Sequence, residues 1–387
     1  MIPYGRQHIT QADIDAVTEV LQSDFLTQGP AVPAFEKRLS ELTTAQHAIA
    51  VNSATSALHL ACLALGVGRG SRVWTSPISF VASANCARYC GADVDFVDVE
   101  PDSGNMAIDK LRLKLEQARS NDTLPQVVIP VHLAGASCDM QQIHYLANEF
   151  GFAIIEDASH AVGASYLDDA VGCCRYSDIT VFSFHPVKII TTAEGGMALT
   201  NNTKLADKMR LLRSHGISRD EGLMTEPSHG NWYYQQLQLG FNYRMTDLQA
   251  ALGLSQSRRL LPIIQKRQLL AANYHRLLAQ LPLSLPALDD DNISAWHLFI
   301  IRLDDKTKRK AVFDGLRDAG IGVNVHYIPI HTQPYYQQLG FDWGDFPVAE
   351  DFYERIISLP MFPELTGDQQ QYIAGQFRKH QIGRAHV

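Results

Sequence analysis

The sequence of 387 residues lacks the cysteine and charge patterns that mark several large classes of protein. Its six cysteines form no Cys-x-x-Cys pair and no regular series of spacings, so we expect reduced thiols rather than a zinc site or a disulfide framework. Basic residues are in the minority, 33 Lys and Arg against 41 Asp and Glu, and the net charge of −8 argues against a general binder of nucleic acid or acidic membranes. This charge balance does not exclude a small anionic ligand held by a few local groups.

Long apolar runs and targeting segments are missing as well. Residues 1–6 are not a basic segment followed by an apolar one, so no signal peptide is expected. Residues 42–68 contain no charged side chain, but polar side chains between Asn52 and His59 interrupt the apolar run and argue against a membrane span. With 46% hydrophobic and 19% charged residues, we expect a folded, cytoplasmic protein, and its length predicts two domains.

Short apolar segments alternate with helical patterns over the first part of the chain. Strands are expected at residues 48–51, 72–75, 94–97, 127–131 and 153–156. Helices of about ten residues are expected between them. Short strands that alternate with helices indicate a mostly parallel sheet with helices on both faces, which is the α/β class.

The pattern changes near residue 259. A long helix is expected at 258–280, and two later strands, 295–302 and 322–327, flank a basic helix. We therefore divide the chain into a large domain, residues 1–258, and a smaller α+β domain, residues 259–387.

One lysine lies in an apolar and nearly charge-free segment, Phe182 to Gly196. Lys188 lies there between an expected strand and a pair of glycines, where an ammonium ion is poorly solvated and its pKa falls. A lysine with a lowered pKa suits a Schiff-base nucleophile. Taken alone, Lys188 is explained more simply as a lysine that reaches solvent from a strand end, so the hypothesis depends on its neighbours.

Two upstream segments supply those neighbours. Asp157 ends an apolar strand, at the edge where open α/β sheets bind ligands, and could keep the ring nitrogen of pyridoxal phosphate protonated. The segment Asn52–Ser56 follows a strand and opens a helix, where backbone N–H groups and the helix dipole favour a phosphate. Each segment alone is also compatible with an ordinary helix cap.

Taken together, these segments resemble the DegT/DnrJ/EryC1/StrS family of sugar aminotransferases over nearly the whole chain. The motifs that carry the resemblance are residues 52–56, 130–135, 156–160, 182–196, 213–216 and 240–253. The resemblance implies a fold-type I enzyme that depends on pyridoxal phosphate, with pyridoxamine phosphate as an intermediate. The segment His185–Thr192 is most similar to the branch of the family that makes UDP-4-amino-4,6-dideoxy-N-acetyl-β-L-altrosamine in pseudaminic acid biosynthesis.

The resemblance also implies which residues bind the cofactor. Lys188 and Asp157 are the implied catalytic residues: Lys188 forms the Schiff base and then acts as general base, and Asp157 pairs with the ring nitrogen. The implied cofactor contacts are Thr55, Ser56, Phe80, Asp157, His160, Ser183, Lys188, Asn242 and Arg244.

Within that set, Thr55, Ser56 and Ser183 are expected at the phosphate. His160 is expected near the phenolic oxygen, and Phe80 is expected to stack on the ring, although alone it would be assigned to the core. Asn242 and Arg244 match positions that reach the phosphate of the neighbouring subunit, which implies a homodimer with composite active sites. Without the resemblance, both would be taken for turn or surface residues.

Substrate contacts are assigned to segments that the family uses around the nucleotide sugar. They are His215, Arg219, Tyr233, His326 and Tyr327. Segment 218–236, rich in glycine and aromatic residues, is expected to be a long functional loop. An isolated histidine is more often structural than functional. His326 and His331 lack an acidic or thiol partner, so we expect no metal site.

One residue departs from the family pattern. Ala193 stands where glycine is expected in Thr-Thr-Gly-Glu-Gly-Gly. If that position requires a positive φ, the alanine adds strain on the order of 1 kcal/mol. We expect activity to be retained, with an altered loop geometry.

The implied reaction moves an amino group from L-glutamate to C4 of a UDP-linked 4-keto-6-deoxy-N-acetylhexosamine and leaves 2-oxoglutarate. Two alternatives stay open. The same scaffold acts on other nucleotide sugars in this family, at C3 or with dTDP as carrier. The second alternative is a non-catalytic, cofactor-binding regulatory protein. Such a protein is expected to have lost site residues or to carry a DNA-binding module, whereas Lys188, Asp157 and Ser183 are all present here and no such module is visible.

Overall fold

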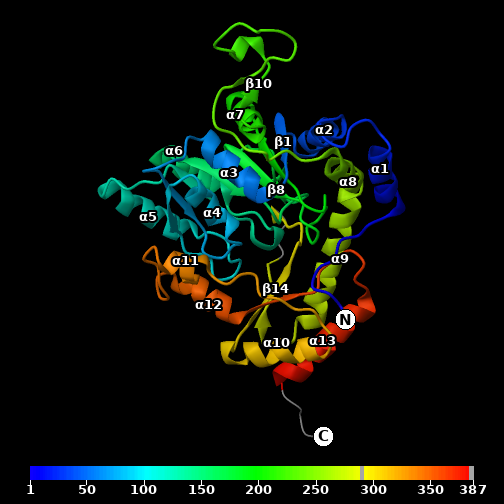
Figure 1. The fold of residues 1–387 in the computed structure, drawn as a ribbon. Helices are drawn as coiled ribbons and strands as arrows, with labels where there is room; N and C mark the ends of the chain where they lie inside the picture. The colour runs from blue at the N-terminus through cyan, green and yellow to red at the C-terminus, as the bar shows by residue number, and fades with distance from the viewer. Residues whose placement is uncertain (288–291, 383–387) are drawn as a thin grey trace.

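The computed structural model describes residues 1–287 and 292–382, and its centre is a seven-stranded sheet (Figure 1). The strands are β1 (His47–Val51), β2 (Arg72–Thr75), β3 (Asp93–Phe96), β4 (Val127–Ile129), β5 (Ala153–Asp157), β8 (Ile179–Ser183) and β9 (Gly196–Thr200). Their order is β1-β9-β8-β5-β4-β2-β3. Only β9 pairs antiparallel, with both β1 and β8, so the prediction of a mostly parallel α/β sheet is confirmed.

Helices cover both faces of this sheet. They are α1 (Gln11–Leu21), α2 (Ala31–Thr43), α3 (Ala54–Ala64), α4 (Ala82–Tyr89), α5 (Ile108–Ser120), α6 (Met140–Phe150), α7 (Thr203–Arg213) and α8 (Asp247–Ser257). Alternate strand residues face opposite cores: Val127 and Ile129 pack in the core that contains α3, α4 and α7, whereas Val128 packs in the core that contains α5 and α6. Both faces are therefore buried, as a parallel sheet requires.

A second, antiparallel sheet lies in the C-terminal part of the chain. It pairs β14 (Phe299–Leu303) with β12 (Leu283–Ser284) and β15 (Ile356–Leu359). The helices around it are α9 (Leu260–Leu278), α10 (Arg309–Asp318), α11 (Pro334–Gln337), α12 (Pro347–Arg355) and α13 (Gly367–Ile382). Apolar side chains of this sheet, α9, α10 and α13 form a core of their own, which supports a separate α+β unit.

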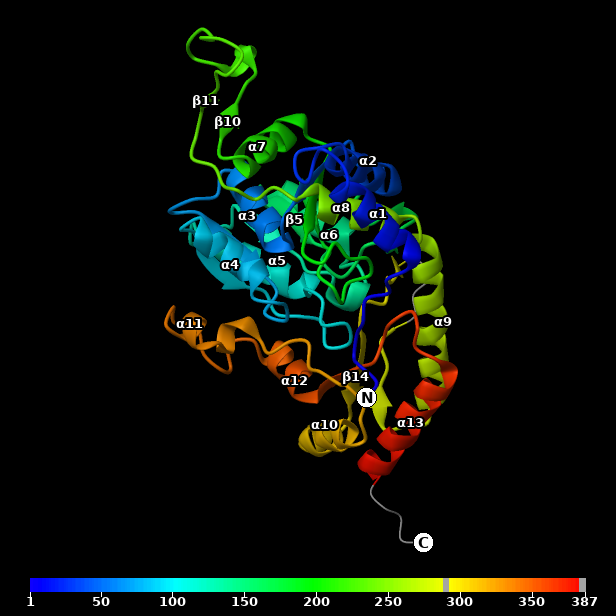
Figure 2. The same ribbon diagram turned by 45° about the vertical axis from the view of Figure 1, so that its right-hand side comes forward.

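Helix α9 joins the two units. Leu260 and Ile263, in its first turn, pack in a core of the large sheet, whereas Tyr274 and Leu278 pack in the core of the small sheet. Figures 1 and 2 show α9 running along one side of the molecule, from α8 down to α13. A boundary at residues 258/259 therefore stays a proposal, with α9 as the element shared between the units.

The first residues of the chain contact the small C-terminal unit. Ile2 pairs in parallel with Ile321, and the Met361 N–H donates to the carbonyl oxygen of Tyr4. Both figures accordingly show the N-terminus close to α13.

The predicted strand at 322–327 is wrong. The segment forms only an isolated pair between Asn324 and Ser358, and no continuous ladder. The Asn324 side chain accepts from the N–H of Val325, at 2.8 Å, which competes with ladder formation. The chain turns instead, and this turn carries His326 and Tyr327 to a cavity described below.

The expected functional loop is an arm that projects from the large unit. It contains the short strands β10 (Ile217–Ser218) and β11 (Gln235–Gln236), which pair antiparallel. Figures 1 and 2 show it standing clear of the sheet beyond α7. Trp232, in the segment between these two strands, is 75% exposed.

The remaining elements are short. A further sheet pairs β6 (Ser165–Tyr166) with β7 (Asp169–Ala170) and β13 (Asn292–Ile293), and 3-10 turns lie at Leu133–Gly135, Glu221–Leu223, Lys306–Lys308 and Ile330–Thr332. Within residues 1–287 and 292–382, none of the helices combines the length and the apolar character needed to cross a lipid bilayer.

Candidate functional site

A cavity of about 470 Å³ lies where β5 and β8 end and α3 begins. This is the carboxyl edge of the parallel strands, where open α/β sheets bind ligands. The predicted site residues that line it are Thr55, Phe80, Asp157, His160, Ser183, Lys188, His326 and Tyr327. The fold thus brings together residues that are far apart in the sequence.

Several predicted residues do not line this cavity. Ser56 is turned away, because its hydroxyl donates to the Asn52 side chain at 2.6 Å. Asn242 is exposed, and its carbonyl oxygen accepts from the Asn52 side chain at 3.4 Å. Arg244 pairs through its backbone with Val51. Both residues therefore lie beside the N-terminal turn of α3 but outside the cavity of their own chain.

The predicted substrate residues divide in the same way. His326 and Tyr327 line the cavity, whereas His215, Arg219 and Tyr233 do not. His215 and Arg219 are exposed on either side of β10, and the Tyr233 ring, two residues before β11, packs on His229 with ring centroids 4.3 Å apart.

Lys188 lies in the turn after β8, on the cavity wall. Burial lowers the pKa of its amine to about 8, although the Asp157 carboxylate acts in the opposite direction. The amine is therefore partly neutral near neutral pH. A neutral amine is what nucleophilic attack on an aldehyde requires.

Asp157 ends β5, and both of its carboxylate oxygens are held by serine hydroxyls. Ser159 donates to Oδ1 and Ser83 donates to Oδ2, each at 2.6 Å. Ser83 in turn lies 2.6 Å from the Ser79 hydroxyl. These bonds fix the plane of the carboxylate.

The first turn of α3 supplies an anion site beside Lys188. Ser53 caps the helix by accepting from the Ser56 N–H, at 3.1 Å. In the described part of the chain, the backbone N–H groups of Ala54 and Thr55 have no protein acceptor. The turn lies so close to β9 that a Cβ on Gly196 would be 2.5 Å from the Ala54 nitrogen. This cradle fits a phosphate, and a cavity with such a cradle, a desolvated lysine and an oriented carboxylate fits pyridoxal phosphate.

His160 and Tyr327 form a pair on another wall of the cavity. The His160 Nδ1 accepts from the Ala134 N–H at 3.2 Å, so its Nε2 carries the proton and donates to the Tyr327 hydroxyl at 3.0 Å. Burial, with smaller contributions from Lys188 and His326, lowers the pKa of His160 well below its ordinary value. The imidazole is therefore a neutral hydrogen-bonding group.

Other cavity residues were not assigned from the sequence. They include Tyr4, Ser53, Ser79, Ser159, His185, Glu194 and His297. His297 is buried, with its ring centroid 4.4 Å from that of His160. A single histidine before a strand of the small unit gives no sequence signal, because only the packing of the two units brings it to the cavity.

Phe80 lies at the mouth of the same cavity. Its side chain is 59% exposed, although it lines the cavity and lies near Tyr327. An open aromatic face beside Lys188 and Asp157 suits stacking on a planar ring, and it differs from the buried ring that a core residue would present.

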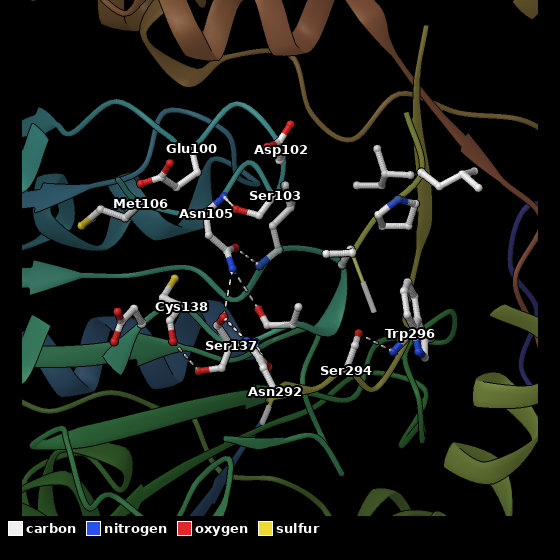
Figure 3. A pocket seen from close by; sticks show the side chains of 18 of the residues that line it. Glu100, Asp102, Ser103, Asn105, Met106, Ser137, Cys138, Asn292, Ser294 and Trp296 are labelled. Atoms are coloured by element: carbon white, nitrogen blue, oxygen red, sulfur yellow. Dashed lines mark hydrogen bonds between the residues drawn. The ribbon is translucent and has the colours of Figure 1, made fainter. Parts of the chain in front are cut away.

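A second and larger cavity, of about 730 Å³, lies between the two units (Figure 3). Asn105 braces one wall, because its side chain donates to the Ser137 carbonyl oxygen at 3.1 Å and accepts from the Leu133 N–H at 3.0 Å. None of the described residues that line it is a lysine or a predicted site residue. The chemistry therefore points to the smaller cavity as the candidate active site.

Ala193, the departure from the family pattern, has a φ of 65°. The position therefore has the positive φ that favours glycine, as expected.

The described residues contain no group of three or more His, Cys, Asp and Glu side chains arranged to hold a metal ion.

The chain was then compared with known proteins. The DegT/DnrJ/EryC1/StrS aminotransferase family matches residues 7–378. Over 373 residues the chain is 41% identical to the spore coat polysaccharide biosynthesis protein SpsC of Bacillus subtilis, covering 95% of this chain and 94% of SpsC. Over 378 residues it is 37% identical to the UDP-4-amino-4,6-dideoxy-N-acetyl-β-L-altrosamine transaminase of Campylobacter jejuni, covering 96% of each chain.

A solved structure shares the whole fold. The putative sugar aminotransferase Spr1654 of Streptococcus pneumoniae, in its PMP form, superposes with a TM-score of 0.90 and 31% identity over 99% of both chains. The same protein has been solved in its PLP form. The predictions of a fold-type I enzyme and of pyridoxal phosphate as cofactor are therefore confirmed.

Proposed function

The chain belongs to the DegT/DnrJ/EryC1/StrS aminotransferase family and is a sugar aminotransferase dependent on pyridoxal phosphate, and from this premise we propose its substrates. The amino acceptor is C4 of a UDP-linked 4-keto-6-deoxy-N-acetylhexosamine, the donor is L-glutamate, and the product is UDP-4-amino-4,6-dideoxy-N-acetyl-β-L-altrosamine. The Campylobacter relative, which has the name of this transaminase and aligns over 96% of both chains, supports the choice. The observation that carries the chemistry is the placement of Lys188 and Asp157 on one cavity beside the first turn of α3.

Pyridoxal phosphate, when bound, supplies an aldehyde that takes up the amino group and a ring that withdraws electrons from the carbon losing its proton. Lys188 supplies the amine that holds this group and later moves the proton. Because its pKa is lowered to about 8, this amine can both take up and release a proton near neutral pH. Lys188 is therefore the proposed general base.

Asp157 and His160 orient the ring. The Asp157 carboxylate, held by Ser83 and Ser159, is the proposed acceptor for the ring N–H. The proton on the His160 Nε2 is directed to Tyr327, and this neutral pair is the proposed neighbour of the phenolic oxygen. Thr55, Ser183 and the N–H groups of the α3 turn are the proposed phosphate contacts of the same chain.

A second acceptor stays a candidate. The chain is 41% identical to SpsC, whose name specifies no acceptor, against 37% to the altrosamine transaminase. The alternative from the sequence, amination of another nucleotide keto-sugar at C3 or on a dTDP carrier, is therefore kept.

An amination assay separates these acceptors. Purified protein loaded with cofactor is incubated with L-glutamate and, in parallel, with the UDP-linked L-arabino 4-keto sugar, its C5 epimer, and dTDP-linked 4-keto and 3-keto sugars. We expect the UDP-linked L-arabino sugar to give the highest kcat/KM. Turnover is measured as the formation of 2-oxoglutarate and from the mass of the amino sugar. Turnover of a dTDP sugar while the UDP-linked L-arabino sugar is ignored would overturn the assignment. Lys188→Ala is the matched control and should abolish turnover with every acceptor.

We also propose a homodimer with composite sites. The support is the position of Asn242 and Arg244, which lie beside the α3 turn but outside the cavity of their own chain. A cytoplasmic location completes the proposal, because all six cysteines are unpaired, as a reducing compartment favours.

A further inference from the structure

Arg267, on α9, is a large side chain that the fold buries almost completely, with 1% of it exposed. In the described part of the chain its hydrogen bonds go to carbonyl oxygens and not to a carboxylate. Its Nη1 donates to the carbonyl oxygens of Trp296, His297 and Met361, at 2.8, 3.4 and 3.2 Å. Burial lowers the pKa of Arg267 to about 10, so the group is still charged at neutral pH. A buried charge is costly, and an apolar side chain of similar volume is often at least as stable, so the cost points to a role beyond packing.

The segment 294–298, which enters β14, is held by α9 from the side of the small unit. Besides Arg267, the next residue of the helix takes part. The Gln268 side chain donates to the Ser294 carbonyl oxygen at 2.6 Å and accepts from the Trp296 indole N–H at 2.8 Å. Two successive residues of α9 therefore fix the backbone of this segment.

The turn Leu133–Gly135 of the large unit holds the opposite side of the segment. Its carbonyl oxygens accept from the N–H groups of Ala295 and Leu298, at 2.9 and 3.2 Å. The middle residue of the turn also donates its N–H to the His160 Nδ1, as described above. The packing leaves no slack, because a Cβ on Gly135 would be 2.9 Å from the His160 carbonyl oxygen and 3.0 Å from a backbone nitrogen of the segment. A displacement of the segment is therefore passed on to His160.

His297 belongs to this segment and lines the candidate active site, whereas Ser294 and Trp296 line the larger cavity (Figure 3). Its side chain is 4% exposed, and its Nδ1 is buried with no hydrogen-bond partner in the described part of the chain. The ring packs on that of His160, with centroids 4.4 Å apart. Because no such bond anchors this nitrogen, the position of the ring depends on the backbone that Arg267 holds.

We propose that Arg267 is a positioning residue of the active site, which acts through His297 on His160. By holding the His297 backbone, it keeps the imidazole packed against His160 and so keeps the His160–Tyr327 pair in place on the cavity wall. Arg267 does not itself line the cavity. The inference rests on the proposed function, which puts this pair beside the phenolic oxygen of the cofactor. A purely stabilising role, in which Arg267 only ties segments of the small unit together, is the alternative to be separated by experiment.

Cofactor affinity tests the proposal independently of the identity of the sugar. The Kd for pyridoxal phosphate is measured by fluorescence titration of cofactor-free, full-length protein, and stability is measured by urea unfolding. We expect Arg267→Met to raise the Kd by about fivefold or more. Arg267→Lys, which keeps a charged donor near the three carbonyl oxygens, should stay within about twofold of the native Kd.

Tyr274→Phe is the matched control on the same helix. Tyr274 is also buried, and its hydroxyl donates to the Pro360 carbonyl oxygen at 2.9 Å, so the variant loses a hydrogen bond of the small unit but none to Trp296 or His297. It should lower the urea midpoint and leave the Kd unchanged. A native Kd in Arg267→Met would overturn the proposal, and so would an equal rise of the Kd in Tyr274→Phe.

A double-mutant cycle tests whether Arg267 acts through His297. We expect His297→Leu to raise the Kd, and we expect the double variant with Arg267→Met to bind little more weakly than either single variant, because both changes remove the same support. Multiplication of the two factors in the double variant would contradict the proposal. If Arg267→Met does not fold, Arg267→Gln, a shorter and uncharged donor, takes its place in both experiments.

His160→Leu separates this inference from the proposed function. If His160→Leu raises the Kd while Arg267→Met leaves it native, only the role of Arg267 is wrong. An unchanged Kd in His160→Leu would contradict the placement of His160 in the proposed function, and the inference on Arg267 would fall with it.

Discussion

Ser83 donates a hydrogen bond of 2.6 Å to Oδ2 of Asp157, across 74 positions of the sequence. Ser83 lies in the first turn of α4 and Asp157 at the end of β5, so the bond ties a helix to the carboxyl edge of the sheet. Because the Ser83 hydroxyl has only one proton and directs it to the carboxylate, the Ser79 hydroxyl is left to donate to Ser83. The orientation of the Asp157 carboxylate therefore depends in part on Ser83, which does not line the cavity.

The first prediction is that Ser83→Ala weakens cofactor binding. Loss of a hydrogen bond to a charged group costs about 1.5–3 kcal/mol, which corresponds to a rise in Kd for pyridoxal phosphate of about tenfold or more. A fluorescence titration of the cofactor-free protein measures it. Ser120→Ala, an exposed serine at the end of α5, is the control. Equal affinities of Ser83→Ala and the native protein would show that Asp157 is positioned without Ser83.

A second prediction concerns the pH dependence of stability. The lowered pKa of Lys188, about 8, means that below pH 8 the cofactor-free fold holds a poorly solvated charge. Between pH 8 and about 10.5 the folded chain releases this proton while the unfolded chain keeps it, so stability rises with pH. Lys188→Met should therefore be more stable than the native protein at pH 7, by about 1–3 kcal/mol, and the gap should shrink to less than about 1 kcal/mol by pH 10.

Urea unfolding at pH 7, 8.5 and 10 measures this gap. Lys37→Met, at an exposed lysine of α2, is the matched control and should show no closing gap. A constant difference between Lys188→Met and the native protein across this range would contradict the lowered pKa.

Ala193→Gly should stabilise the protein. Ala193 is exposed and has a φ of 65°, so glycine relieves a backbone strain of about 1 kcal/mol. Ala272→Gly, at an exposed position inside α9, should instead destabilise by a similar amount, because glycine is a poor helix former. Denaturant midpoints at equal m-values give both signs. A loss of stability in Ala193→Gly would mean that the position is not strained.

Gly196→Ala should damage the phosphate cradle. A Cβ there would be 2.5 Å from the backbone of Ser53 and Ala54, so the α3 turn must move. We expect a loss of cofactor affinity of tenfold or more, measured by equilibrium dialysis. Gly68→Ala, where a Cβ meets nothing within 4 Å, is the control. Unchanged affinity would show that the turn tolerates the displacement.

Mixed dimers test the composite site. Lys188→Ala and Asn242→Ala are each expected to lose most activity, but if Asn242 serves the partner's site, a hybrid dimer contains one intact site. Random mixing after unfolding and refolding should then restore about a quarter of the native activity. A mixture no more active than its parents would place Asn242 in its own chain's site.

The sequence allowed much of the large unit to be predicted. Apolar strands with helical segments between them indicate a parallel sheet. Asp157 was found because it ends such a strand, and Lys188 because it lies in an apolar, nearly charge-free segment after the next one. Residue 322 onward shows where this reasoning ends. The segment has strand-like composition, but Asn324 bonds to its own backbone, and only the packing of the two units decides where His326 points.

The site residues that the sequence did not predict were missed for the same reason, which is that packing between distant segments places them. Ser83 and His297 carry no local pattern that separates them from other helical serines or strand-end histidines. Their roles come from contacts over long sequence separations, Ser83 with Asp157 and His297 with His160. Conversely, Asn242 and Arg244 matched a motif, yet one chain gives them no cavity to line.

The contact between the N-terminal residues and the small unit limits which fragments of the chain can be expected to fold. A fragment that starts at residue 259 would leave Ile321 without its partner Ile2 and the Met361 N–H without the Tyr4 carbonyl oxygen. A fragment that ends at residue 258 would carry an N-terminal segment with nothing to pair with. The two units therefore have separate packed cores but share the N-terminal segment, and a fragment meant to contain the small unit should carry residues 1–4 joined to the C-terminal part.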